Sequence, residues 1–202
     1  RFFAKILSKH KNIIGPKNPE KHFDKFDKIW EAIEYNETEK VLELFPTPQN
    51  GKIYLTRRSI PHALFPGNAA HSFEFPPLEK FINVAKNKGF TPLLFITVRS
   101  PIPNILSWKN KRASGKQSLK ITLQQYQNVY PYIFSAVLKT NTQYYILPQE
   151  SLIVDGNLFI KSIFSLLGLS IYDNFEYPEI LNDFNSIYYE ELNRMQNKNL
   201  NK

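Results

Sequence analysis

Apolar residues recur at helical spacing in several stretches of the chain. Phe26 and Trp30, for example, lie four positions apart, which places them on one face of an α-helix. Gly89 and Gly168 each follow such a stretch, and glycine commonly ends a helix. The spacing predicts helices at residues 1–9, 22–36, 77–88, about 103–112, about 118–139 and 157–167, with a short helical or extended piece in 38–50.

Three stretches show the pattern of β-strands instead. Residues 92–98, PLLFITV, are an uninterrupted apolar run, which is typical of a buried strand in a parallel sheet. Residues 52–56 and 143–147 are shorter candidates. Because strands alternate with helices, the sequence predicts an α/β fold with a mainly parallel sheet, whose carboxyl edge would bind ligands. Residues 10–21 and 59–77 lack periodicity and are predicted as loops.

Length and composition fit one domain. The chain has 202 residues, 42% hydrophobic and 14% aromatic, which is enough for a packed core. The absence of cysteine excludes disulfides, thiolate zinc ligands and a cysteine nucleophile. No apolar run reaches the roughly 18 residues of a membrane span. We therefore expect a soluble, cytoplasmic protein whose single domain is residues 1–202, with a frayed tail from about residue 193.

Positive charge is concentrated in the middle of the chain. The net charge is +8, yet residues 51–120 carry 12 Lys and Arg against 2 Asp and Glu. Such a segment favours an anionic partner, whether phosphate, sulfate, nucleic acid or anionic lipid. A solvated basic surface is the alternative. The basic residues coincide with the strongest strand pattern, however, which favours a functional role.

Arg99 and Ser107 are the first candidate binding residues. Arg99 directly follows the predicted strand 92–98, so it would lie at the ligand edge of the sheet. Ser107 falls eight residues later, within the next predicted helix. A guanidinium and a hydroxyl placed in this way can converge on one phosphate group.

At these residues the chain resembles the sulfotransferase family. The stretch FITVRSPIPNILSWKNKR matches the order and spacing of the family's 3′-phosphate motif, which is a strand, an Arg and a Ser eight residues later. The resemblance implies a P-loop NTPase-like, three-layer α/β sandwich and 3′-phosphoadenylyl sulfate as the sulfuryl donor. Adenosine 3′,5′-bisphosphate would be the product, and Arg99 and Ser107 would hold its 3′-phosphate.

Two further stretches support this resemblance in part. The family often carries a Y-E-D-L-type turn and then a helix ending in F-L-G-L. The chain has Gln149-Glu150-Ser151-Leu152 and, later, Leu166-Leu167-Gly168-Leu169. Gln149 stands where an aromatic residue often lies near the adenine. At the amino end, RFFAKIL resembles the helix after the family's 5′-phosphosulfate loop, so Phe2 would stack on the adenine.

The segment TRRSIPHALFP resembles the K-T-H-L-P-like segment that supplies the family's general base. Ser59 stands in the place of that histidine, and Arg57 in the place of the lysine. His62 is then the nearest candidate base, because imidazole titrates near neutral pH. His71 and Glu74 are the next choices. Arg57 and Arg58 would stabilise the charge on the transferring group.

The family's Gly- and Ser/Thr-rich 5′-phosphosulfate loop does not occur in residues 1–202. The chain also does not begin with Met. We therefore expect it to start just after the first strand and loop; otherwise it is a degenerate relative. The expected activity is sulfuryl transfer to a hydroxyl or amine of a carbohydrate or other small acceptor, without metal.

Three alternatives remain at this point. One is a catalytically inactive, sulfotransferase-like binding protein. Another is a basic nucleic-acid-binding protein, in which the segment 51–120 tracks a phosphate backbone. No signature of a common nucleic-acid-binding motif occurs, which counts against it. A nucleotide kinase or NTPase is disfavoured because G-x4-G-K-[ST] is absent.

Overall fold

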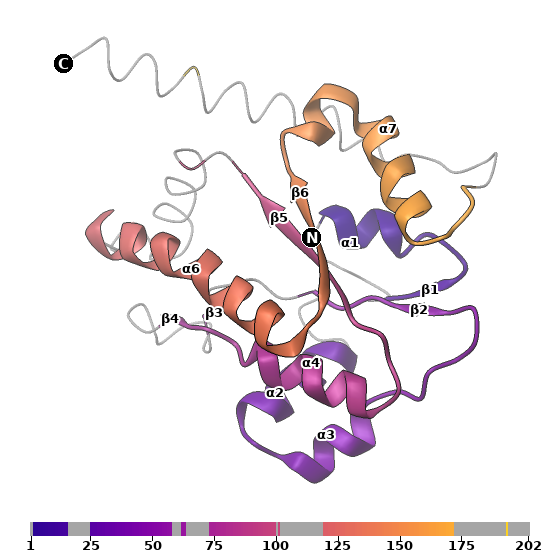
Figure 1. Ribbon diagram of the computed structural model, residues 1–202, viewed down its shortest axis with the longest axis vertical. Coiled ribbons are helices and arrows are strands. Elements are labelled where there is room, and N and C mark those ends of the chain that lie inside the picture. Colours follow the sequence, from indigo (N-terminus) through magenta and orange to yellow (C-terminus); the bar gives the residue numbers. More distant parts are fainter. Residues whose placement is uncertain are drawn as a thin grey trace. The chain divides into compact units, whose positions relative to one another are not determined.

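The computed structural model describes residues 2–15, 25–57, 62–63, 73–99, 101, 119–171 and 193 (Figure 1). The chain divides into two compact units that interleave along the sequence. The first comprises Arg1–Leu94 and Lys109–Tyr144, and the second Phe95–Trp108 and Tyr145–Lys202.

The helices of the first unit confirm the helical stripes of the sequence. Predictions at 1–9, 22–36, 77–88 and 118–139 correspond to real helices, and 38–50 begins with one. Gly89 has a φ of 83°, so it ends its helix in the left-handed conformation that glycine adopts without strain. The helices are α1 (Phe2–Leu7), α2 (Lys25–Glu34), α3 (Thr38–Leu44), α4 (Leu78–Asn87) and α6 (Leu119–Thr140).

Short strands join these helices. β1 (Ile13–Ile14) pairs in parallel with β2 (Ile53–Tyr54), and Ile13 lies opposite Ile53. β3 (His62–Ala63) pairs with β4 (Phe73–Glu74) in antiparallel. The strand at 52–56 was predicted. β1, β3 and β4 fall in the segments 10–21 and 59–77, so the prediction that these segments are only loops was wrong. Two residues are too few to show an alternating pattern.

An aromatic cluster forms the centre of the first unit. The rings of Trp30 and Phe81 stack with centroids 4.0 Å apart and planes at 9°. Phe45 lies 5.6 Å from Phe81, and Tyr54 meets Phe90 edge-on at 5.2 Å. These rings come from α2, α4, β2 and the residues that follow α3 and α4, so their packing fixes these segments against one another.

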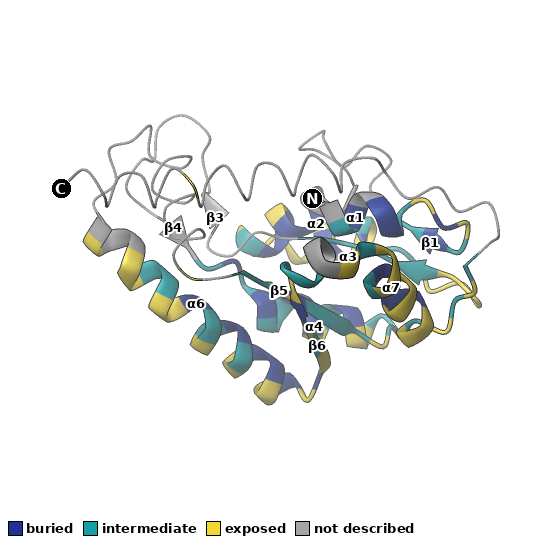
Figure 2. Ribbon diagram, turned by 90° about the horizontal axis from the view of Figure 1, so that it is seen from above, coloured by how far each residue is buried: buried dark blue, intermediate teal, exposed yellow. Residues whose placement is uncertain are grey.

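α4 packs on the carboxyl-terminal half of α6. Both helices turn buried residues inward, and the outer side of α6 is exposed along its length (Figure 2). α6 contains Pro131, which removes one hydrogen bond from the helix. The buried apolar residues are Leu78, Phe81, Ile82 and Ala85 of α4, and Val129, Ile133, Ala136 and Val137 of α6.

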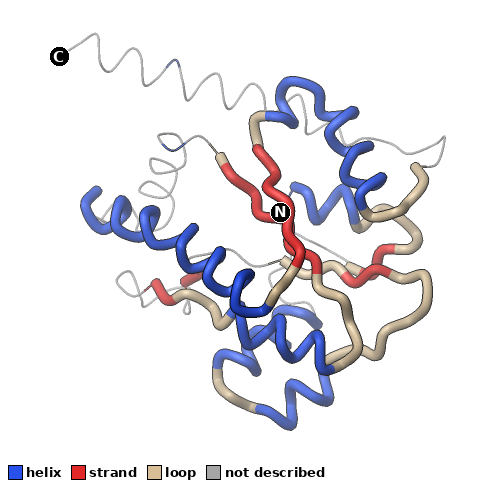
Figure 3. Tube along the Cα trace, in the orientation of Figure 1, coloured by secondary structure: helices blue, strands red, loops and turns tan. Residues whose placement is uncertain are grey.

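β5 (Leu93–Val98) and β6 (Gln143–Pro148) form the longest strand pair (Figure 3). Phe95 stacks on Tyr145 at 6.0 Å, and Gln149 N donates to Val98 O at 2.8 Å. Both contacts join residues about fifty positions apart, so the strands run in parallel. This confirms an α/β fold with parallel strands.

The apolar run of β5 is less buried than its composition predicts. Within β5 only Ile96 is buried, whereas Thr97 is exposed and the other residues are half-buried. Among the described residues, β5 pairs with β6 alone. The prediction of a buried strand was therefore wrong for most of β5. It assumed that both faces of the strand would be covered, as they are in parallel sheets with helices on either side.

α7 (Ser151–Leu166) follows β6 in the second unit and contains a kink. Asp155 has non-helical φ and ψ of −151° and 80°, and its Oδ1 accepts a hydrogen bond from Leu158 N at 3.0 Å. Asp155 thus caps the part of α7 that starts near the predicted residue 157. Phe164 is fully buried, and Gly168 ends the helix with a φ of 65°.

Candidate functional site

The carboxyl ends of β5 and β6 lie side by side. The hydrogen bond from Gln149 N to Val98 O, 2.8 Å long, joins the two ends directly. Arg99 is the next residue after Val98 and is half-buried. The structure therefore places Arg99 where the sequence predicted it, at the carboxyl end of a parallel strand, where α/β proteins commonly bind ligands.

The turn from β6 into α7 lies at the same edge. Gln149 and Glu150 form this turn, and α7 begins at Ser151. Through the hydrogen bond of Gln149 to Val98, the turn is next to the start of the Arg99 segment. The sequence predicted this strand–turn–helix order. Ser107, the expected partner of Arg99, lies outside the described residues, as do Lys109, Lys111 and Arg112.

The candidate bases His62 and Glu74 belong to one strand pair. His62 in β3 lies opposite Glu74 in β4 in the antiparallel register. From the sequence, these two residues were alternative candidates for the general base, twelve positions apart. Opposite residues of an antiparallel pair are cross-strand neighbours, so the structure brings these alternatives together. His71 and Arg58 lie outside the described residues.

Arg57 directly follows a residue that is hydrogen-bonded to a buried tryptophan. Trp30 Nε1 donates a hydrogen bond to Thr56 Oγ1 at 3.1 Å, and Thr56 directly precedes Arg57. Trp30 is itself buried and stacked on Phe81. Arg57 is half-buried. Phe2, the predicted adenine contact, lies at the start of α1.

Two lysines of the basic segment bind the ends of helices. Lys88 Nζ donates to Leu42 O in the last turn of α3 at 3.0 Å. Lys86 Nζ donates to Thr140 O, at the last residue of α6. The carbonyls at a helix end lack helical partners and carry partial negative charge. These ammonium groups therefore stabilise the fold.

Lys52 and Lys80 also contact oxygen atoms far away in the sequence. Lys52 Nζ donates to Lys11 O at 3.1 Å, and Lys80 Nζ donates to Asn36 Oδ1 at 2.6 Å. Much of the described basic segment thus makes contacts within the protein. The charge pattern of the sequence predicted an anionic partner. These intramolecular contacts leave fewer cations of the segment available to such a partner.

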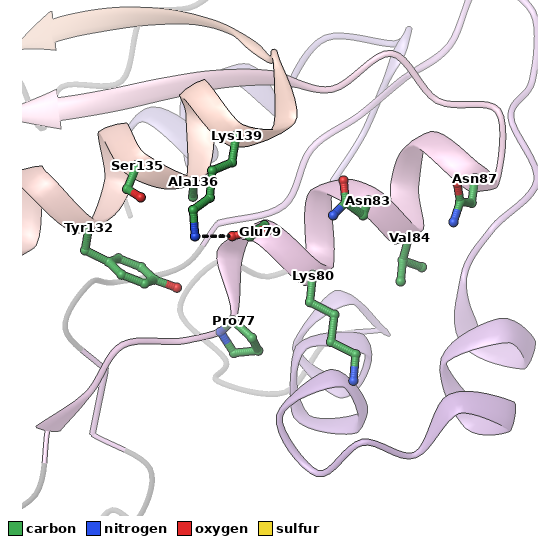
Figure 4. A pocket seen from close by; sticks show the side chains of 10 residues that line it. All are labelled: Pro77, Glu79, Lys80, Asn83, Val84, Asn87, Tyr132, Ser135, Ala136 and Lys139. Carbon is green, nitrogen blue, oxygen red and sulfur yellow. Dashed lines mark hydrogen bonds and ion pairs between the residues drawn. The ribbon is translucent and has the colours of Figure 1, made fainter.

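A groove of about 520 Å³ lies between α4 and α6, within the first unit (Figure 4). One ion pair spans it, from Lys139 Nζ to Glu79 Oε2, at 3.3 Å. Sequence reasoning missed this groove, because polar residues on solvated helix faces give no distinctive pattern. Its polar walls are Glu79, Asn83 and Asn87 on α4 and Tyr132, Ser135 and Lys139 on α6.

Tyr132 closes one end of this groove. Its hydroxyl donates to Pro76 O and accepts from Leu78 N, the latter at 3.0 Å. Burial raises the pKa of the Tyr132 phenol above its usual 10; the bond from Leu78 opposes this shift, and the charge of Glu79 adds to it. The ring stacks on Phe75 at 4.7 Å. Tyr132 thus fixes the start of α4.

No family model, curated protein or solved structure matches the chain. Of the helices described above, none is long and apolar enough to cross a membrane. Nowhere in the described part of the chain do three or more His, Asp or Glu residues gather in a way that could hold a metal ion.

Proposed function

We propose that the protein binds 3′-phosphoadenylyl sulfate at the edge formed by β5 and β6 and transfers its sulfuryl group to a hydroxyl or amine of an acceptor. The observation that carries this proposal is the position of Arg99. It follows a parallel strand whose carboxyl end is bonded to the turn that leads into α7. The resemblance of FITVRSPIPNILSWKNKR to the sulfotransferase 3′-phosphate motif supplies the chemistry.

The finer architecture is part of the same proposal. Two of the described strand pairs, β1–β2 and β5–β6, consist of parallel strands. The proposed architecture is a three-layer, P-loop NTPase-like sandwich of a single domain with a mainly parallel sheet. A parallel sheet needs helical crossovers between its strands, and α6 connects β5 to β6 in this way.

Arg99 and Ser107 hold the 3′-phosphate in this proposal. The guanidinium of Arg99 supplies a fork of donors with a full positive charge, and the hydroxyl of Ser107 supplies one more donor. Phe2 contacts the adenine. Gln149 departs from the family pattern, because it lacks the aromatic ring that often lies there. We therefore assign base stacking to Phe2 alone.

His62 accepts the proton of the acceptor hydroxyl as this oxygen forms its bond to sulfur. The bond between sulfur and the bridging phosphate oxygen breaks, and adenosine 3′,5′-bisphosphate leaves. Glu74, opposite His62 in the strand pair, stabilises the imidazolium that results. Arg57 and Arg58 stabilise negative charge on the transferring group and the bridging oxygen, and the proposed mechanism assigns no step to a metal.

The second candidate is a non-catalytic relative that binds the nucleotide. Ser59 favours it, because a serine stands where the family has its general base. A nucleic-acid-binding function receives less support. Lys52, Lys86 and Lys88 of the basic segment each donate to main-chain oxygens of the protein.

Calorimetric titration of the full-length protein with adenosine 3′,5′-bisphosphate tests the proposal. ADP is the control ligand, since it lacks the 3′-phosphate. We expect Arg99→Ala to weaken binding of the bisphosphate about ten- to hundredfold, as loss of a charged hydrogen-bond donor does. Lys161→Ala, which removes an exposed charge from α7, is the matched control and retains full affinity.

Three results would overturn the nucleotide site: no binding, equal affinity for ADP, or an unchanged affinity of Arg99→Ala. If the nucleotide binds, an assay with radiolabelled sulfuryl donor and a panel of acceptors separates the two candidates. Label transfer that depends on His62 supports the transferase. Tight binding without transfer to any acceptor supports the non-catalytic relative.

A further inference from the structure

The groove between α4 and α6 presents hydrogen-bonding groups on two facing walls. Asn83 and Asn87 lie one helical turn apart on α4, and Ser135 lies on α6 (Figure 4). All three are exposed. Their side chains bond to no other residue in the described part of the chain. These two amides and one hydroxyl therefore remain available to a ligand.

The groove carries little net charge. Glu79 and Lys139 neutralise each other across it at 3.3 Å, and their side chains are 46% and 62% exposed. Lys80 also lines the groove and keeps its positive charge, but its ammonium group points away from Ser135 and Lys139 (Figure 4) and bonds to the neutral amide oxygen Asn36 Oδ1 at 2.6 Å. An anionic ligand would have to displace Glu79 from Lys139. The charge balance therefore favours a neutral ligand.

The remaining groups both donate and accept. An amide has two donors and a carbonyl oxygen, and a hydroxyl is donor and acceptor at once. Sugar hydroxyls have the same dual character. Tyr132 adds an apolar surface, because its hydroxyl is already bonded to Pro76 and Leu78. Val84 and Ala136 extend this surface.

From these features we infer that the α4/α6 groove is a binding site for a neutral carbohydrate chain. Its volume of about 520 Å³ falls within the range of about 300–1,000 Å³ that is usual for ligand pockets. Asn83, Asn87 and Ser135 bind sugar hydroxyls, and the exposed part of the Tyr132 ring packs against the C–H groups of a sugar ring. This site shares no residue with the proposed nucleotide site and does not depend on it.

Nuclear magnetic resonance of the full chain tests the inference. The probes are maltotriose, cellotriose and triacetylchitotriose, and the signals followed are the side-chain amide groups of Asn83 and Asn87. We expect at least one of these trisaccharides to shift both signals in a saturable way. Asn83→Ala and Asn87→Ala should each weaken binding about three- to tenfold, as loss of one hydrogen bond does.

Two further variants locate the site. Ser135→Trp fills the groove from an exposed position and should abolish the shifts while the melting temperature stays unchanged. Gln127→Ala removes an exposed amide of α6 that does not line the groove and should bind normally. Arg99→Ala should also bind the sugar normally, so failure of the nucleotide site and failure of this site are distinguishable.

Each contrary result overturns the carbohydrate site. One is the absence of any shift up to about 10 mM sugar, above the millimolar range of weak specific binding. Another is stronger binding of galacturonate trisaccharide or glucose 6-sulfate than of the neutral probes. A third is binding that survives Ser135→Trp, which would place the sugar elsewhere.

Discussion

The indole Nε1 of Trp30 donates a hydrogen bond to Thr56 Oγ1 at 3.1 Å. This bond connects the centre of the first unit to the segment that carries Arg57. The ring of Trp30 also stacks on Phe81 at 4.0 Å. One side chain therefore performs two tasks, filling the core and positioning a basic residue, and these tasks can be separated by substitution.

Trp30→Phe should retain most of the stacking and lose the hydrogen bond. We expect the free energy of unfolding in urea to fall by about 1–2 kcal/mol, which reflects the lost bond and the smaller ring. Trp30→Ala should cost about 3–5 kcal/mol, because it leaves a cavity. A double-mutant cycle with Thr56→Val should give a coupling energy of about 1 kcal/mol. Additive effects of the two substitutions would contradict the role of the bond.

Tyr132→Phe should destabilise the protein by about 1–2 kcal/mol, because Pro76 O and Leu78 N lose their hydroxyl partner. The control is Tyr35→Phe, since Tyr35 is 54% exposed; it should change stability by less than about 0.5 kcal/mol. Equal effects of the two substitutions in urea unfolding would show that the hydroxyl of Tyr132 is not structural.

The raised pKa of Tyr132 also predicts a pH dependence. In the unfolded chain the phenol ionises near 10, and in the folded protein it ionises at higher pH. The unfolded state therefore loses this proton first, so the stabilisation is complete below pH 10 and is lost as pH rises through the folded pKa. Above pH 10, the melting temperature should fall less steeply with rising pH for Tyr132→Phe than for the wild type. Parallel curves would contradict the shift.

Lys88→Met should lower stability by about 0.3–1 kcal/mol, because it removes the cation at the end of α3 while keeping an apolar stem. Lys28→Met removes the same charge from an exposed position on α2 and should leave stability unchanged. Both variants should bind single-stranded RNA equally. If Lys88 contacted nucleic acid, Lys88→Met alone would reduce the salt dependence of binding by about one unit.

Long periodic stretches were predictable from the sequence because burial imposes a helical repeat. The helix at 118–139 and the ends of α4 and α7 at Gly89 and Gly168 are examples, and both glycines have positive φ. β1 was not predictable, since two residues carry no period. The early start of α7 was hidden by the kink at Asp155, whose cap resembles a true helix start.

The candidate site was predictable only where it depends on local order. Arg99 follows a strand, and that order is visible in the sequence. The pairing of His62 with Glu74 was not, because strands of two residues show no pattern that predicts their antiparallel register. The groove was also hidden: Asn83 and Ser135 come from helices that meet through tertiary packing alone. The spacing of four between Asn83 and Asn87 places them on one helix face, but polar pairs with this spacing are common on solvated helices.

Asp155→Ala should destabilise the protein by about 1 kcal/mol, because Leu158 N loses its capping acceptor. Asp155→Asn keeps a capping oxygen and should cost only a few tenths of a kcal/mol. Guanidinium unfolding followed by circular dichroism would measure both. If the two variants were equally unstable, the charge of Asp155 rather than its hydrogen bond would matter.

His62 and Glu74 form the last test, which rests on the proposed sulfuryl transfer. His62→Ala should lower kcat about 10²–10⁴-fold, the range for loss of a general base, while the affinity for adenosine 3′,5′-bisphosphate stays unchanged. Glu74→Gln should lower kcat less, because it removes a stabilising charge and leaves the base in place. Its effect should vanish in the His62→Ala background, since a residue that acts through the imidazole has nothing left to stabilise. Glu74 would be the base instead if Glu74→Gln lowered kcat as much as His62→Ala does, and by the same factor in the wild type and in the His62→Ala background.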